Sequence, residues 1–314
     1  MKQNKKVVRI LLVILAAIAF TACTSEPVAW ETDYEVASEV AQSQNKGIFL
    51  VFTGTSWDGV TQTLKTNVLD TEKFMKKVGK NYVLCNIDIA GEEDPDVPEE
   101  VAMKQYELAM NYNIQSIPTA LLLTKEGIPF TQVDFSAETL TPEDGIALVT
   151  ASDDNFKKLT KLQKAVESAK GAKKVQAIDE LFEATDNNYR MNLEEYILLV
   201  PELDPENTTG LLGKYQLTGA YISSNVAFAM GDAEGAINCF LSLVEDENTV
   251  LDSDQIQEAY YVAAYISAQS GVSSLDEIVS LLTKAYEAAP TSEGATGIQE
   301  TITALTATTA EVTE

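Results

Sequence analysis

Short apolar runs alternate with helical periods along residues 30–150, and this alternation constrains the fold more than any other feature of the chain. Residues 31–44 carry apolar side chains at helical spacing, and residues 47–53 form a continuous apolar run with the length of a buried strand. A helix at 59–69, a strand at 82–89 and a helix at 101–112 are predicted next. Strands at 120–124 and 130–135 and a helix from 141 onward follow. This order predicts an α/β domain in which helices cover both faces of a central mixed sheet.

The N-terminus has the order of an export signal. Basic residues between Lys2 and Arg9 precede an apolar run from Ile10 to Phe20, and small residues follow up to Cys23. The run is shorter than the roughly 20 residues that a membrane-spanning helix needs. Residues 20–23 (Phe-Thr-Ala-Cys) are similar to a bacterial lipobox, although leucine is usual where Phe20 stands.

The lipobox resemblance implies cleavage before Cys23 and acylation of that cysteine. We therefore predict a lipoprotein signal peptide at 1–22 and a linker at 23–29. The lipid on Cys23 is expected to anchor the exported protein to a bacterial envelope membrane, facing the periplasm. A secreted protein without a lipid and an uncleaved anchor are the alternatives.

The chain is strongly acidic, with 48 Asp and Glu residues against 22 Lys and Arg residues and a net charge of −26. Such a charge repels phosphate backbones, so we predict no nucleic-acid partner. The charge either keeps an envelope protein soluble or attracts a cationic partner.

Histidine is absent from the chain, which excludes serine triads and ordinary zinc sites. Beyond Cys23 the only cysteines are Cys85 and Cys239, and both stand in apolar patterns that predict buried thiols. A redox pair between them is the alternative. Asp88 and the acidic stretch 92–100 carry clustered carboxylates, but their spacing does not match a helix–loop–helix calcium site. No metal and no cofactor are predicted.

Two segments resemble the thioredoxin family. Residues 45–57 are similar to the strand that leads to the Trp-Cys-x-x-Cys motif, and residues 108–119 are similar to the segment before the family's cis-proline. The helix that follows Trp30 is similar to the opening of exported members. The resemblance covers residues 30–150 and implies a thioredoxin-like domain with a cis peptide bond between Ile117 and Pro118.

The two cysteines of the family motif are replaced. Aligned on Trp57, their positions hold Asp58 and Thr61. Disulfide exchange requires an attacking thiolate and a second thiol, and neither a carboxylate nor a hydroxyl replaces them. We therefore predict a redox-inactive domain with no catalytic residues, in which Asp58 and Thr61 cap the helix that follows.

Two interpretations of this region stay open, a peptide-binding groove or a capping turn without a function. The candidate site consists of the degenerate motif and the cis-proline segment, namely Trp57, Asp58, Gly59, Val60, Thr61, Ile117, Pro118 and Thr119.

The sequence pattern predicts helices throughout the second half of the chain. A helical domain is predicted at 151–290, with periods at 156–166 and 175–182 and helices at 193–200, 212–230, 233–244, 253–270 and 275–289. The tight turn at Gly231 and the small Ala285 resemble tetratricopeptide repeats, with irregular antiparallel helices as the alternative. Either a protein-contact surface or a helical cap on the first domain is expected. Residues 291–314 are expected to form a loose helix or disordered tail.

These features favour an envelope protein that binds another protein or a peptide. Two alternatives are an enzyme that uses carboxylates such as Asp58 or Asp88 and one that uses Cys85 and Cys239 as a redox pair.

Overall fold

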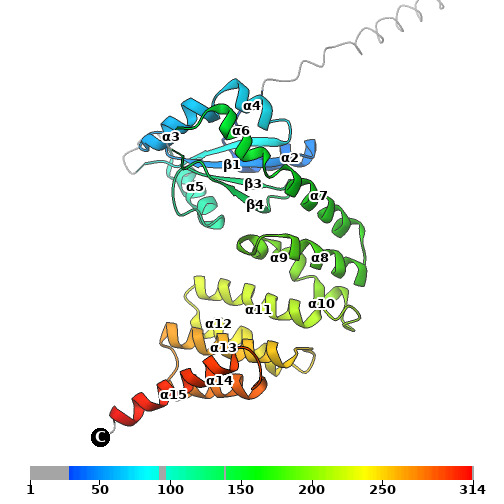
Figure 1. The fold of residues 1–314 in the computed structure, drawn as a ribbon, viewed down its shortest axis with the longest axis vertical. Coiled ribbons are helices and arrows are strands. Elements are labelled where there is room, and N and C mark those ends of the chain that lie inside the picture. The colour runs from blue at the N-terminus through cyan, green and yellow to red at the C-terminus, as the bar shows by residue number, and fades with distance from the viewer. Residues whose placement is uncertain (1–27, 92–96, 138, 313–314) are drawn as a thin grey trace, which may run out of the picture.

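The computed structural model describes residues 28–91, 97–137 and 139–312, and Figure 1 shows an α/β part followed by a stack of helices. The predicted signal peptide, Cys23 and residues 92–96 of the acidic stretch lie outside the described residues. Within the described ranges, no helix has the length and apolar character needed to cross a bilayer.

The sheet has four strands in the order β2-β1-β3-β4, with bounds β1 (Gly47–Thr53), β2 (Tyr82–Asp88), β3 (Thr119–Leu123) and β4 (Pro129–Val133). β1 runs parallel to β2 and antiparallel to β3, and β3 and β4 are antiparallel. All residues of β1 are buried, because the strand lies inside the sheet and both faces of the sheet are covered. The predicted mixed sheet is confirmed.

Side chains of β1 alternate between two apolar clusters. Leu50 belongs to the cluster under α2 (Tyr34–Gln44) and α5 (Glu99–Asn111). Phe49 belongs to the other cluster, under α4 (Glu72–Val78) and α6 (Pro142–Thr150). Helices therefore cover both faces, as predicted.

The predicted single helix at 59–69 was wrong in detail. The structure has a short helix, α3 (Gly59–Leu64), followed by a π-helical turn, η1 (Lys65–Leu69), in which Asp70 N donates to Lys65 O. The helix α4 was not predicted, because only Phe74 and Val78 are buried in it and two such residues do not establish a helical period.

The first helices of the second half share the apolar core of the sheet. These helices are α7 (Asp153–Ser168) and α8 (Ala172–Ala184). The Phe156 ring on α7 lies 5.8 Å from the Phe130 ring on β4 and 5.2 Å from the Tyr82 ring on β2. Val166 and Ile178 are buried in the same cluster as Phe49. The helical region therefore begins as a layer on the sheet.

The predicted helix at 193–200 is broken in the structure. Three short elements stand there, η2 (Asn187–Leu193, a 3-10 helix), α9 (Glu194–Ile197) and α10 (Val200–Leu203). Pro201 stands in the first turn of α10, where a proline without an N–H is tolerated but cannot continue a preceding helix.

A helical stack follows, with consecutive helices packed as neighbours: α11 (Leu212–Ala229), α12 (Ala233–Glu245), α13 (Ser253–Ser270), α14 (Leu275–Ala288) and α15 (Ala295–Val312). The predicted helical region is confirmed. Residues 291–314 were expected to form a loose helix or a disordered tail, and the structure has a helix, α15, whose Ile298 is buried against α14, with Ile302 and Leu305 packed beside it. Their spacing along one helix face is the signal that the Thr- and Ala-rich composition obscured.

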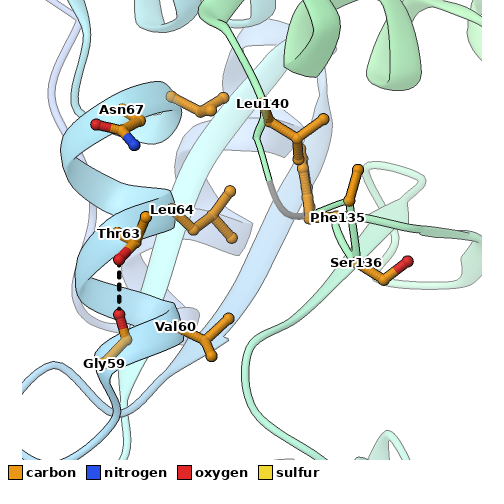
Figure 2. A pocket seen from close by; sticks show the side chains of 10 residues that line it. Gly59, Val60, Thr63, Leu64, Asn67, Phe135, Ser136 and Leu140 are labelled. Atoms are coloured by element: carbon orange, nitrogen blue, oxygen red, sulfur yellow. Dashed lines mark hydrogen bonds between the residues drawn. The ribbon is translucent and has the colours of Figure 1, made fainter.

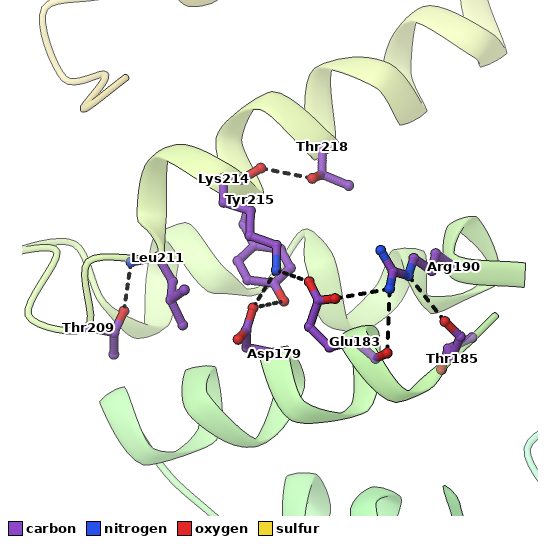
Figure 3. Close-up of polar contacts among 9 residues, drawn as sticks. All are labelled: Asp179, Glu183, Thr185, Arg190, Thr209, Leu211, Lys214, Tyr215 and Thr218. Atoms are coloured by element: carbon purple, nitrogen blue, oxygen red, sulfur yellow. Dashed lines mark hydrogen bonds and ion pairs between the residues drawn. The ribbon is translucent and has the colours of Figure 1, made fainter. Parts of the chain in front are cut away.

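A polar network joins α11 to α8 and η2 (Figure 3). Lys214 Nζ lies 2.6 Å from both Asp179 Oδ1 and Glu183 Oε1, and the Tyr215 hydroxyl donates to Asp179 at 3.0 Å. Arg190 pairs with Glu183 at 3.0 Å, so one carboxylate connects cations from two elements. The network fixes the helical stack to the helices that cover the sheet.

Asp204 organises the loop between α10 and α11. Its Oδ1 accepts hydrogen bonds from the backbone N–H and the hydroxyl of Thr208, and its Oδ2 accepts the same pair from Thr209, all at 2.6 to 2.8 Å. The hydroxyl groups of Thr208 and Thr209 hold the pKa of this carboxyl well below its usual range.

A carboxyl whose pKa is lowered by folding stabilises the protein at pH values above its unfolded pKa of about 3.9, and this contribution is lost as pH falls. We expect Asp204→Asn to lower the free energy of unfolding at neutral pH. The difference from the natural chain should narrow as the pH falls below about 4. Urea unfolding of both proteins across this range measures the effect, and a difference independent of pH would contradict it.

Candidate functional site

The loop after β1 holds Trp57 at the surface in a fixed position. The Trp57 indole is 52% exposed, yet its Nε1 donates to Ile89 O at 2.9 Å. The ring lies against Gly54, where an added Cβ would meet the ring carbon Cε2 at 2.5 Å. A glycine at 54 is therefore required for this placement of the indole.

Asp58 caps α3. It has an extended backbone, and its Oδ2 accepts a hydrogen bond from Thr61 N at 2.7 Å. Burial acts to raise the pKa of the Asp58 carboxyl, but hydrogen bonds from Thr61 and Val60 outweigh it and hold the pKa below its usual value. The carboxylate is thus ionised and engaged with the backbone.

Thr61, which the sequence resemblance aligns with the second cysteine of the family motif, is fully buried. Its Oγ1 accepts from Gly54 N at 3.3 Å and so ties the start of the loop to α3. Asp58 and Thr61 therefore keep the loop in place.

Asp88, the other carboxylate considered for chemistry, supports the same loop. Its Oδ1 accepts from the Thr53 hydroxyl at 2.8 Å and from Thr55 N at 2.7 Å. Because these contacts occupy the oxygen that faces the loop, the structure uses Asp88 to hold the chain after β1.

The cis-proline segment lies at the same end of the sheet as this loop. The Ile117–Pro118 peptide bond is cis, as the resemblance implies. Thr119 pairs with Phe52 near the end of β1, from which the loop to Trp57 departs. The structure therefore brings together two segments that are about sixty residues apart in the sequence. Among the described residues, the backbone N–H and C=O of Ile117 have no hydrogen-bond partner.

An apolar cavity of about 350 Å³ adjoins the degenerate motif (Figure 2). Val60 and Leu64 on α3 face Phe135 and Leu140, which follow β4, across this cavity. Val60 is 62% exposed at its rim. The cavity was not predicted, because Leu140 lies in an irregular segment and Phe135, predicted as the end of a strand at 130–135, lies beyond the end of β4 at Val133.

Both described cysteines are free, and they belong to different parts of the molecule. Cys85 is buried in β2, and burial, with Asp33 and Glu31 nearby, raises the pKa of its thiol to about 12. Cys239 is only partly buried on α12, in the helical stack of Figure 1, contrary to the predicted core position. The structure therefore does not bring them together as a redox pair.

Metal coordination finds no support in the part of the chain that is described, where no group of three His, Cys, Asp or Glu side chains could hold an ion.

Comparisons with known proteins match the two halves of the chain separately. Residues 29–125 match a family model described as thioredoxin-like, and the N-terminal domain has a thioredoxin-like fold. Residues 211–311 match a model described as an uncharacterised protein C-terminal domain, which extends through most of α15.

An uncharacterized protein of Treponema pallidum (strain Nichols) is 22% identical over 288 residues, which are 92% of this chain and 93% of the relative. The thioredoxin-related protein DsbJ of Chlamydia pneumoniae is 24% identical over 127 residues, which are 40% of this chain and 36% of that protein. A solved structure of a DsbH oxidoreductase is 22% identical, covering 44% of this chain and 92% of the other, with a TM-score of 0.35.

Proposed function

We propose that the thioredoxin-like domain binds an extended polypeptide segment and does not exchange disulfides. The observation that carries the proposal is the way in which residues 57–61 are held and exposed. Asp58 and Thr61 are tied into the loop by hydrogen bonds, while Trp57 and Val60 are left exposed beside an apolar cavity.

The geometry offers both kinds of contact that an extended segment uses. The free backbone groups of Ile117 suit main-chain hydrogen bonds, and the cavity beside Val60 has room for one apolar side chain. Trp57 adds a large amphipathic surface that remains in one orientation, so little conformational entropy is lost on binding.

The residues near the site support the proposal that the domain does not exchange disulfides. No thiol stands in the motif, and the Cys85 thiol is buried with a raised pKa, so it supplies no thiolate at neutral pH.

Val60→Asp tests the binding site. The probe is ribonuclease A with carbamidomethylated cysteines, which is unfolded, basic and free of thiols. We expect the substitution to raise the Kd at least about tenfold, because a carboxylate then meets the apolar part of the ligand. Isothermal titration calorimetry measures it.

Val36→Asp is the matched control, because Val36 is 44% exposed on α2, which covers the other face of the sheet, and the change in charge is the same. Equal effects of the two substitutions would assign the loss to charge alone and would count against the site.

We further propose that the protein is exported and held at a bacterial envelope membrane by a lipid on Cys23. The support is the basic and apolar order of residues 1–22 before that cysteine. Cys23→Ala is expected to move the protein from the membrane fraction to the soluble fraction or to leave its precursor uncleaved. Membrane association and processing identical to those of the natural chain would refute the anchor.

A further inference from the structure

The C-terminal ends of α11 and α13 carry an apolar surface, here called the end patch. Its members are three aromatic side chains that are at least 43% exposed, namely Phe228, Tyr261 and Tyr265. Exposed apolar side chains are ordinary when scattered, but a contiguous group of them marks an interaction site.

One hydrogen bond sets the alignment of the two helices. The Tyr221 hydroxyl on α11 lies 2.7 Å from Glu258 Oε1 on α13. α12 packs against both helices and is joined to each by a short connection, so α11 and α13 run in the same direction. Two turns beyond this contact, α11 reaches Phe228 and α13 reaches Tyr265.

The loops that follow these helices lie at the same end. Met230 opens the turn to α12 and Val272 lies in the turn to α14, and both side chains are exposed. Figure 1 shows the ends of α11 and α13 on the same side of the helical stack. The register set by Tyr221 and Glu258 thus brings Phe228 and Tyr265 to the same level at this end, on the helix faces that carry that contact.

The charge around the end patch is of one sign. Residues 211–311 contain 14 Asp and Glu residues and two lysines. Lys214 is paired with Asp179 and Glu183, and Lys284 lies over the Tyr260 ring. Asp232 and Asp276 stand at the starts of α12 and α14, which adjoin the patch.

We propose that the end patch docks a basic protein segment that also carries apolar side chains. Its aromatic centre buries the apolar side chains, and the acidic surroundings attract the lysines and arginines. An anionic membrane surface and a second copy of this acidic chain are both repelled. This docking is separate from peptide binding at Val60 and extends the proposed function.

A synthetic amphipathic peptide of leucine and lysine tests the proposal, with a twin in which glutamate replaces lysine. We expect the lysine peptide to bind and its affinity to fall with added salt. Phe228→Ser with Tyr265→Ser should raise its Kd at least about tenfold, because two aromatic contacts are lost. Both residues are exposed, so folding should be retained, which circular dichroism checks.

Met103→Ser with Met110→Ser is the matched control, because both methionines are exposed on α5. The control variant should bind the peptide like the natural chain. Three results would overturn the proposal: equal losses in the two double variants, equal binding of the glutamate twin, or a natural dimer in sedimentation that the end-patch variant dissociates. If Val60→Asp abolished binding of the lysine peptide and the end-patch variant did not, the peptide would be bound at the cavity beside Val60, and the proposal would also be overturned.

Discussion

Replacing Asp58 and Thr61 together by cysteine is expected to create a dithiol that reduces insulin, whereas the natural chain should show only the background rate. Position 58 is the N-cap of α3, where a side-chain oxygen accepts a hydrogen bond from the Thr61 N–H. A thiolate there replaces the carboxylate and gains the same hydrogen bond, so its pKa should fall from about 8.5 toward about 7. The pH dependence of thiolate absorbance measures the pKa, and insulin precipitation measures the activity.

Asp58→Cys alone is the control for the double variant. It keeps Thr61 and should form a mixed disulfide with added glutathione but no internal disulfide. If the two introduced cysteines cannot pair in the double variant, positions 58 and 61 do not correspond to the family's cysteine positions.

Phe49→Ala is expected to lower the free energy of unfolding by about 3–5 kcal/mol. Phe49 is fully buried in β1, and its ring centroid lies 5.9, 5.6 and 6.3 Å from the ring centroids of Trp30, Phe74 and Phe135. Truncation removes the side chain at the centre of the cluster and leaves a cavity that these rings cannot fill without moving. Urea unfolding followed by circular dichroism gives the value.

Phe228→Ala is the same substitution at a residue that is 51% exposed, and its effect should stay below about 1 kcal/mol. Comparable losses in the two variants would mean that the cluster around Phe49 does not hold the domain together.

The regular part of the fold could be predicted because its apolar patterns are long or continuous. The run at 47–53 became β1, and the helical period at 253–270 became α13 with the same bounds. Prediction was poorest where short elements depend on tertiary contacts. α4 has only two buried residues, and the region predicted as one helix at 193–200 is divided between the end of η2, α9 and the start of α10.

The candidate site was predictable in its positions but not in its contacts. The resemblance to the thioredoxin family located Trp57 and Pro118. Their proximity depends on the pairing of Phe52 with Thr119, which joins two strands that are far apart in the sequence. The cavity could not be predicted, because Leu64 and Phe135 meet only after α3 and the segment after β4 pack together. The end patch could not be predicted either, because it depends on how α11 and α13 align with each other.

Backbone amide chemical shifts, recorded while an unfolded polypeptide is titrated into the protein, show where the polypeptide binds. With carbamidomethylated ribonuclease A, we expect shifts confined to Trp57–Val68, Ser116–Thr119 and the cavity residues Phe135 and Leu140, with no change in the number of free thiols. Shifts that spare these segments would contradict the claim that the degenerate thioredoxin-like site binds polypeptide.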